Sequence, residues 1–421
     1  MERVINENKK IDETEYKYIL DNGMKVIIIP KKETNKKYII WGAKFGSIDN
    51  HFIEPVTNKE IKVPDGVAHY LEHKMFEQKN GVDSLYTLMA LGLDANAYTT
   101  NDHTAYLFGG VDNFYKGLDE LMDYVQNPYF TDQNVEKERG IIGQEIGMYD
   151  DDPFWTLYIN TMRCLYKNNP ITIDTAGTVE TISHITKETL YSCYNTFYHP
   201  SNMTMCVSGN FEPDELIKEI EKRLLIHEKQ KGEIKRIYPD YETDINEKRK
   251  EVTKNINMPI FMIGYRDFTQ EESKVKKYIA QKIIFNSILG KCSKTYNDLY
   301  NAGLLSHSLD FDYEFSDIYA HSIINGDTKE IDKVYNIITD ALENEEISKE
   351  DFERSKKKIY GDLLTNFEDV EDAARNFLVD SIHGIDSFEY FDEIEKISLE
   401  DCKQIQKEIF KKDKSVISIV K

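Results

Sequence analysis

One short run of the sequence groups residues that could bind a metal and move a proton. It reads His69-Tyr70-Leu71-Glu72-His73, an H-x-x-E-H pattern. On a helix, where successive residues are about 100° apart, His69, Glu72 and His73 lie on one face. Imidazoles are common zinc ligands, and a carboxylate beside them can accept a proton from water. The pattern therefore predicts a zinc site, against the alternative of a solvated helix face with incidental histidines.

The third ligand must come from another segment, because a catalytic zinc has three protein ligands and one open position. Residues 132–149 are expected to form a helix, and four of its residues follow the spacing of one helix face: Glu138, Ile141, Ile142 and Glu145. The two carboxylates can flank this apolar stripe with their charged ends in water. Alternatively, Glu145 binds zinc and Glu138 supports a ligand from outside. Helix spacing alone leaves both interpretations open.

The charge of the chain argues against a nucleic-acid partner. Its 421 residues include 75 acidic and 53 basic side chains, a net charge of −22, and the acids are spread along the whole length. Residues 1–19 are polar, and the longest apolar stretches, such as Val26–Pro30, fall far short of a membrane span. We therefore expect a soluble cytoplasmic protein with no membrane partner.

The cysteines are expected to be reduced thiols in the core. They are odd in number and widely spaced, with no C-x-x-C pair and no secretory signal to favour disulfides: Cys164, Cys193, Cys206, Cys292 and Cys402. A cysteine nucleophile is the alternative, but no neighbouring residues supply a mechanism for one.

The length predicts more than one domain, and the two halves of the chain resemble each other. A polar stretch at 227–255 is the best candidate for a linker, and Asn22-Gly23 predicts a hairpin over residues 16–30. Ile182-x-x-Ile185-Thr186-x-Glu188 has the spacing of Ile394-x-x-Ile397-Ser398-x-Glu400, and each run leads into an apolar segment of strand character. A duplicated α+β unit explains this better than two unrelated helices with ordinary caps.

The run Asp65–Glu77 resembles the insulinase/pitrilysin peptidases, whose third zinc ligand is a Glu in a helix reading E-x-x-x-x-x-x-E, as Glu138 and Glu145 do. Four more runs match the family: Asn22-Gly23, Asn96-Ala97-Tyr98-Thr99, Ala176-Gly177-Thr178 and Tyr198-His199-Pro200-Ser201-Asn202-Met203. The match is dense in the first half of the chain and weak in the second. Within the family, His73–Glu77 and Gly143–Pro153 look most like bacterial proteins associated with elongation factor P 5-aminopentanol modification.

The resemblance implies a zinc metalloendopeptidase with one zinc per chain, held by His69, His73 and Glu145. Glu72 is then the general base, and Glu138 fixes the tautomer of a ligand histidine. The implied fold is α+β, with two related units, each a mostly antiparallel sheet packed with helices. Residues 1–230 form the zinc-binding peptidase domain and 231–421 a related metal-free domain.

The resemblance also implies how a peptide substrate and a partner are bound. The family holds peptides along a strand that matches Asn96 and Ala97; the alternative is an ordinary internal strand. His103, a few residues further, is expected to be a loop histidine rather than a ligand. The family closes its chamber with four related units, so we expect a heterodimer with a second insulinase-like subunit, with a homodimer as the alternative. The family's L-R-x-x-G-L-x-Y motif aligns with 299–306, where Tyr300 and Ser306 replace its Arg and Tyr.

Two other functions compete with a peptidase. One is a non-catalytic assembly or accessory subunit that keeps the peptidase fold, for example in elongation factor P modification. The other is a zinc-dependent hydrolase of a small amide. Retention of all four residues of the implied site favours catalysis over the first.

Overall fold

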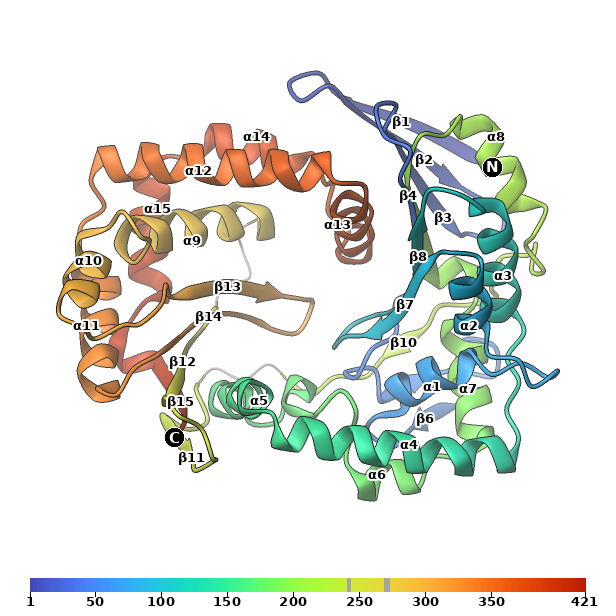
Figure 1. Cartoon of the computed structure of the whole chain (residues 1–421), viewed down its shortest axis with the longest axis horizontal. Helices are drawn as coiled ribbons and strands as arrows, with labels where there is room; N and C mark the ends of the chain where they lie inside the picture. Colours follow the sequence, from blue (N-terminus) through green and yellow to red (C-terminus); the bar gives the residue numbers. More distant parts are fainter. Residues whose placement is uncertain (241–243, 269–272) are drawn as a thin grey trace. The chain divides into compact units, whose positions relative to one another are not determined.

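The computed structural model describes residues 1–240, 244–268 and 273–421, which form two compact units (Figure 1). Unit 1 comprises residues 1–146, 173–237 and 364–387, and unit 2 comprises residues 147–172, 238–363 and 388–421. The predicted boundary at 230/231 lies close to the crossing after residue 237. The chain, however, also crosses between the units after residues 146, 172, 363 and 387. Each unit is therefore assembled from both halves of the sequence.

Unit 1 is built on a seven-stranded sheet in the order β1-β2-β3-β9-β4-β8-β7. All of its strands pair antiparallel except β3 and β9. The strands are β1 (Glu2–Asn8), β2 (Glu13–Ile19), β3 (Lys25–Pro30), β4 (Lys37–Ala43), β7 (Asp94–Thr99), β8 (Thr104–Gly110) and β9 (Met203–Gly209). A small second sheet joins β5 (His51–Ile53), β6 (Glu60–Lys62) and β10 (Lys235–Arg236).

The helices of unit 1 pack on both faces of the large sheet. They are α1 (Val67–Met75), α2 (Ser84–Ala90), α3 (Phe114–Gln126), α4 (Asp132–Asp151), α6 (Val179–Ser183), α7 (Lys187–Phe197), α8 (Pro213–Glu221) and α13 (Val370–His383), with short 3-10 turns at Pro170–Thr172 in unit 2 and Pro200–Asn202 in unit 1. The last turn of α4 passes into unit 2. Helices α1 and α3 contact β8 from one side, and α13 covers β4 and β9 from the other.

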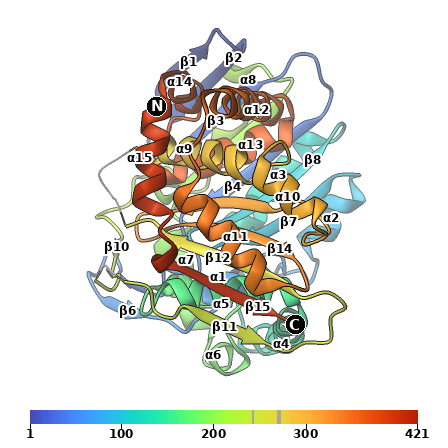
Figure 2. The ribbon, with the colours of Figure 1, turned by 90° about the vertical axis from the view of Figure 1, so that its left-hand side faces the viewer.

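Unit 2 is built on a five-stranded sheet in the order β11-β15-β12-β14-β13. Its strands are β11 (Arg249–Val252), β12 (Ile260–Arg266), β13 (Asp310–Phe315), β14 (Ala320–Asp327) and β15 (Ser415–Val420). Its helices are α5 (Pro153–Leu165), α9 (Lys274–Ile288), α10 (Lys294–Asn301), α11 (Ile331–Asn344), α12 (Lys349–Glu368, whose last turn passes into unit 1), α14 (Glu389–Lys396) and α15 (Leu399–Ile409), with a 3-10 turn at Lys412–Lys414. Figure 2 looks onto the side of unit 2 that α9, α10, α11 and α15 cover.

The two units are repeats of one design, which confirms the predicted α+β duplication. The order β3-β9-β4-β8-β7 corresponds strand by strand to β11-β15-β12-β14-β13, with the parallel pair in the same place. Thr186 caps α7 and Ser398 caps α15, each accepting a hydrogen bond from the backbone N–H three residues on. Gly42 in β4 lies under Leu378 of α13, and the corresponding Gly264 in β12 lies under α5. The covering helix of each sheet therefore comes from the other half of the sequence.

Several local predictions can be compared with the structure. The hairpin forms between β2 and β3, but its loop has three residues instead of two, because Leu20 still pairs with Met24. The predicted linker 227–255 contains β10 and β11, and its residues 241–243 lie outside the described residues. Four cysteines are buried as predicted, whereas Cys292 is exposed because it lies in the turn between α9 and α10. Within the described residues, no helix has the length and apolar character to cross a membrane.

At two glycine-containing motifs, two segments of main chain approach each other too closely for a side chain to fit between them. Gly66, at the N-cap of α1, has φ +89°, and a Cβ at this position would lie 2.4 Å from the carbonyl oxygen of Ala176. A Cβ on Gly177 would lie 2.6 Å from the carbonyl oxygen of Asp65. The loop 174–178 thus fixes where α1 begins, and only glycine allows this approach.

We expect Gly66→Ala to lower the free energy of unfolding by about 2–4 kcal/mol, because it combines left-handed backbone strain with a clash against main chain. Urea unfolding of the full chain, followed by circular dichroism, measures the shift. Gly140→Ala is the matched control: Gly140 lies in α4 with nothing within 4 Å of an added Cβ. The control should be neutral or stabilising by up to about 1 kcal/mol. If the two variants had the same urea midpoint of unfolding, the backbone at the start of α1 would be shown to tolerate a side chain.

Candidate metal centre

Helix α1 is anchored by its apolar face, which leaves its polar face turned toward α4. Val67, Tyr70, Leu71 and Met75 are at most 3% exposed. The hydroxyl of Tyr70 donates a hydrogen bond to the carbonyl oxygen of Val135, so that α1 and α4 are joined directly. The remaining face carries His69, Glu72 and His73, as the H-x-x-E-H spacing predicts.

Helix α4 supplies the carboxylates. Val135, Glu138, Ile142 and Ile146 are buried along one side, and Glu145 lies beside them, half-buried. Ile141 was predicted on this face but is 46% exposed, because the buried stripe runs through 135, 138, 142 and 146 instead. The carboxylates are thus turned toward α1, with the side chain of Glu138 11% exposed and that of Glu145 26% exposed.

Three side chains from the two helices converge on one point. The ligand atoms of His69, His73 and Glu145 all lie within 4.8 Å of one another. The Glu145 carboxylate oxygens lie 3.6 Å from Nε2 of His69 and 3.3 Å from Nε2 of His73. A tetrahedral ion with ligand bonds of about 2.1 Å separates its ligand atoms by about 3.4 Å. The separations therefore fit a zinc-sized ion, and nitrogen and carboxylate donors suit zinc.

Glu138 and Lys74 support this group from behind. Oε1 of Glu138 lies 3.2 Å from Nδ1 of His73, which leaves Nε2 of the same ring directed at Glu145. Lys74, fully buried, lies 3.5 Å from Glu138 and 2.7 Å from Glu77. Sequence analysis did not single out Lys74, although a lysine adjacent to His73 on the buried side of a helix must find a carboxylate.

The same contacts set the protonation of the site in the metal-free chain. Burial alone would lower the pKa of His73, but Glu138 and Glu145 outweigh burial and raise it to about 10. Burial opposes ionisation of Glu138, yet the contacts with His73 and Lys74 lower its pKa. One imidazole of the site is therefore cationic at neutral pH until a metal replaces its proton.

Glu72 lies beside the histidines but makes a different contact. Its side chain is buried, and burial raises the pKa of its carboxyl group. The hydroxyl of Thr99, at the end of β7, donates to Oε2 of Glu72 at 2.7 Å. This bond fixes the orientation of the carboxylate through one of its two oxygens.

Strand β7 is the last strand of the large sheet, so one of its edges has no neighbouring strand among the described residues. Asn96 is exposed and Ala97 half-buried. Ala95, Ala97 and Thr99 point to the α1 side, because they stand opposite Phe108, Tyr106 and Thr104 of β8. Asn96 and Ala97 thus lie on an edge strand, and this strand ends beside Glu72.

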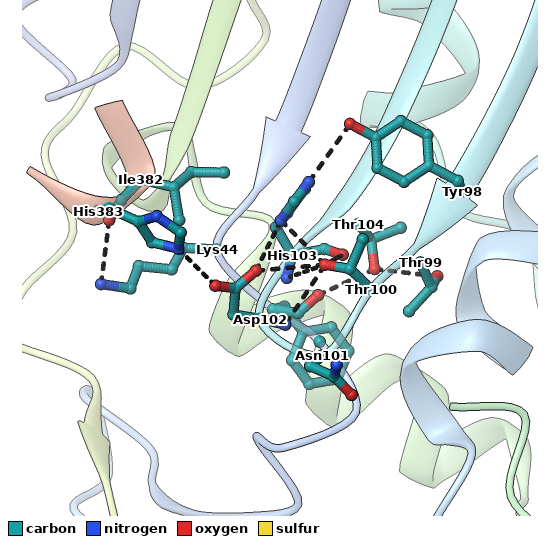
Figure 3. Close-up of polar contacts among 12 residues, drawn as sticks. Lys44, Tyr98, Thr99, Thr100, Asn101, Asp102, His103, Thr104, Ile382 and His383 are labelled. Carbon is teal, nitrogen blue, oxygen red and sulfur yellow. Dashed lines mark hydrogen bonds and ion pairs between the residues drawn. The ribbon is translucent and has the colours of Figure 1, made fainter. Parts of the chain in front are cut away.

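A second histidine cluster holds the turn that follows β7 (Figure 3). Asp102 accepts hydrogen bonds on its two oxygens from Nδ1 of His103 at 2.7 Å and from Nε2 of His383 at 2.6 Å. The two rings lower the pKa of Asp102 despite its burial. His383 is the last residue of α13. The cluster therefore fastens α13 to the turn that directly follows Thr99. His103 is thus a structural loop residue, as expected.

Comparison with known families identifies two matching regions. A family model described as "Insulinase (Peptidase family M16)" matches residues 58–178, and one described as "Peptidase M16 inactive domain" matches residues 184–359. The first contains α1 and α4 with every residue of the candidate metal centre. The second begins before α7 and extends through most of unit 2.

Individual relatives match over the whole chain. "Uncharacterized zinc protease YmfH" of Bacillus subtilis is 38% identical over 410 residues, 96% of each chain. The solved structure of a putative M16-like peptidase from Alicyclobacillus acidocaldarius has a TM-score of 0.92 at 31% identity, covering 97% of this chain and 98% of the other. The periplasmic protease PqqL of Escherichia coli shares the fold, with a TM-score of 0.76 at 18% identity, but this chain covers only 48% of it.

We expect zinc uptake at pH 7.5 to release about one proton, because the proton held on His73 must leave before its nitrogen can bind the ion. The apparent zinc affinity should then fall by about tenfold for each pH unit below the raised pKa of His73. Calorimetric titrations in two buffers of different ionisation enthalpy measure the released protons. Glu138→Gln removes one of the carboxylates that raise this pKa, so it should release fewer protons. Zinc uptake with no proton release at pH 7.5 would contradict the assignment.

Proposed function

Because the chain belongs to the insulinase family of peptidases, M16, we propose that it is the zinc-binding subunit of an endopeptidase that hydrolyses peptides in a closed chamber. The convergence of His69, His73 and Glu145 beside a buried Glu72 carries this proposal. These residues would hold one zinc ion per chain, with an open fourth position. The names of the curated relatives as zinc proteases support the choice of metal.

In this proposal, the protein's own residues divide the work. A bound zinc ion would supply a Lewis acid that polarises the scissile carbonyl and acidifies water. Glu72 would take a proton from the attacking water and give it to the leaving amine. Its burial suits both steps, since a carboxylate with a raised pKa holds the proton long enough to pass it on. Thr99 would keep the carboxylate oriented, and Glu138 would keep His73 in one tautomer.

The peptide would lie along the free edge of β7. Main-chain pairing with Asn96 and Ala97 would hold it extended, which is the usual way that an exposed strand binds a peptide. The strand leads directly to Thr99 and Glu72. A peptide paired there therefore passes the general base, whereas a small amide would gain nothing from the edge.

We expect Glu72→Gln to keep one zinc per chain and lose at least about 100-fold in kcat, because only the proton acceptor is removed. His73→Ala and Glu145→Ala should lose both metal and activity. Metal analysis and cleavage of a diverse peptide mixture, read by mass spectrometry, measure the two properties. Glu136→Gln, an exposed acid on α4, is the control and should change neither. If wild-type and Glu72→Gln proteins behave alike, the accessory-subunit function replaces the peptidase.

We propose further that a second, non-identical insulinase-like subunit completes the chamber. The chain spans about half the length of the PqqL protease, so a single chain supplies half of such a protein. At the positions where the family motif has Arg and Tyr, this chain has Tyr300 and Ser306, and the Tyr300 side chain is 54% exposed. The partner would supply the Arg and Tyr, while this chain supplies the zinc.

Copurification from the native cell should then recover a paralogue that lacks H-x-x-E-H. The mixture should cleave peptides at least about tenfold faster than either subunit, because each half of the chamber carries part of the site. Size-exclusion chromatography with light scattering distinguishes a heterodimer from a homodimer. Full activity from a pure preparation of this chain would refute the division of labour and favour the homodimer.

A further inference from the structure

Unit 1 contains a polar cavity of about 590 Å³ on the α13 side of its sheet. It lies where β8 ends in Gly109 and Gly110, which have no side chains to fill the space. The charged and hydroxyl side chains of its lining are Lys36, Tyr38, Asp94, Asp112, Glu371 and Arg375. None of them belongs to the candidate metal centre, which faces the opposite side of the sheet.

The cavity contains an unsatisfied polar group. Tyr38 is 2% exposed, and its hydroxyl has no hydrogen-bond partner within the described part of the chain. Burial, with a smaller contribution from the nearby Glu371 carboxylate, raises the pKa of this hydroxyl, so it stays protonated at any ordinary pH. Its contact with Glu371 does not reach the geometry of a hydrogen bond. A buried hydroxyl without a partner costs free energy. A polar group entering the cavity would relieve that cost.

The charges around the cavity are unbalanced. Arg375 binds Glu371 through Nε and Nη2 and stacks over the rings of Tyr38 and Tyr98, so this cation is already neutralised. Lys36, the other cation of the lining, lies 3.8 Å from Glu371 and 3.9 Å from Asp369, so it is also paired. The side chains of Asp94 and Asp112 make no hydrogen bond or ion pair with any other described residue. The cavity therefore presents two available carboxylates and one available hydroxyl.

The cavity also lies along the edge proposed to bind substrate. Side chains alternate along a strand, so Asp94 and Asn96 face α13 while Ala95, Ala97 and Thr99 face α1. A peptide added to the β7 edge alternates in the same way. Its side chains on the α13 side would pass over the cavity. Asp94 and Thr99 are five residues apart, about 17 Å along a strand, so the cavity is three to five peptide residues from the reacting bond.

We propose that this cavity is a specificity subsite for a lysine or arginine side chain of the peptide, three to five residues from the cleaved bond. The inference rests on the proposed function. A basic side chain would pair with Asp94 and Asp112 and donate to the hydroxyl oxygen of Tyr38. An acidic side chain would meet two carboxylates, and an apolar one would leave the hydroxyl unsatisfied.

The test uses a peptide that the full chain cleaves, with every other charge removed. Each position from three to five residues on either side of the cut is replaced in turn by Lys, Gln or Glu. At one position, kcat/KM should be about three- to tenfold higher for Lys than for Gln, and lower again for Glu, as expected for one or two partly exposed ion pairs. The preference should weaken in high salt, because these pairs are near the surface.

Variants of the cavity residues test whether the cavity causes the preference for Lys. Asp94→Asn with Asp112→Asn should abolish the preference for Lys, and Tyr38→Phe should reduce it. Glu180→Gln with Glu212→Gln is the matched control, since it removes two exposed acids from α6 and the start of α8 and changes the net charge equally. The control should retain the full preference.

A binding measurement separates the proposed subsite from the proposed peptidase activity. It follows the fluorescence anisotropy of the same peptides, labelled, as they bind the Glu72→Gln protein. Tighter binding of the Lys peptide with no cleavage by the wild-type chain would support the subsite and count against the peptidase. Cleavage with equal rates and equal binding for Lys, Gln and Glu at every position would overturn the subsite and leave the peptidase in place. A preference that persists in the Asp94→Asn, Asp112→Asn protein would also overturn it.

Discussion

Three carboxylates and two imidazoles share the space between α1 and α4, and each has lost part of its contact with water. Groups of this kind are stable in a protein interior only when their charges and hydrogen bonds are matched. Buried Lys74 balances Glu138, and Glu138 in turn holds His73. The remaining imbalance, around Glu145 and the Nε2 atoms, is what a divalent cation would neutralise. The positions of both helices therefore depend on satisfying this one group of charges.

The surrounding backbone keeps these two helices in place. The start of α1 is fixed by the meeting of Gly66 with the loop at Ala176, and its middle by the Tyr70 hydroxyl on α4. The strand beside it, β7, borders two features of unit 1. Its α1 face ends at the Thr99–Glu72 hydrogen bond, and its α13 face borders the polar cavity. In the proposed function, this single edge strand would therefore link the chemistry on one face of the sheet with recognition on the other.

Within the described residues, the group of metal-binding side chains is found in unit 1 and has no counterpart in unit 2. In unit 2, α9 occupies the repeat position of α1 and carries no histidine. Its buried lysine is matched locally: Lys277 lies 3.0 Å from Asp267, which also accepts a hydrogen bond from the hydroxyl of Tyr313. The same scaffold thus supports an ion pair in one copy and a group of candidate metal ligands in the other. Each sheet is covered by a helix from the opposite half of the chain, so neither half of the sequence contains a complete unit.

The sequence by itself determined the features that depend on local periodicity. The H-x-x-E-H spacing placed His69, Glu72 and His73 on one helix face, the seven-residue spacing placed Glu138 and Glu145 together, and the cap residues Thr186 and Ser398 marked the repeat. The spacing of residues shows which side chains share one face of a helix. It does not show which segment of the chain packs against that face.

Only the tertiary structure decided that the α4 carboxylates turn toward α1, because this orientation depends on α1 packing against α4. It also decided the pairing of His383 with Asp102 and the exchange of α5 and α13 between the sheets. These contacts join residues that are far apart in the chain, so no local sequence pattern can predict them. The cavity beside Tyr38 arises in the same way, from β4, β7, β8 and α13 together. Its unsatisfied hydroxyl and unpaired carboxylates are properties of that packing, since each residue alone is an ordinary tyrosine or aspartate.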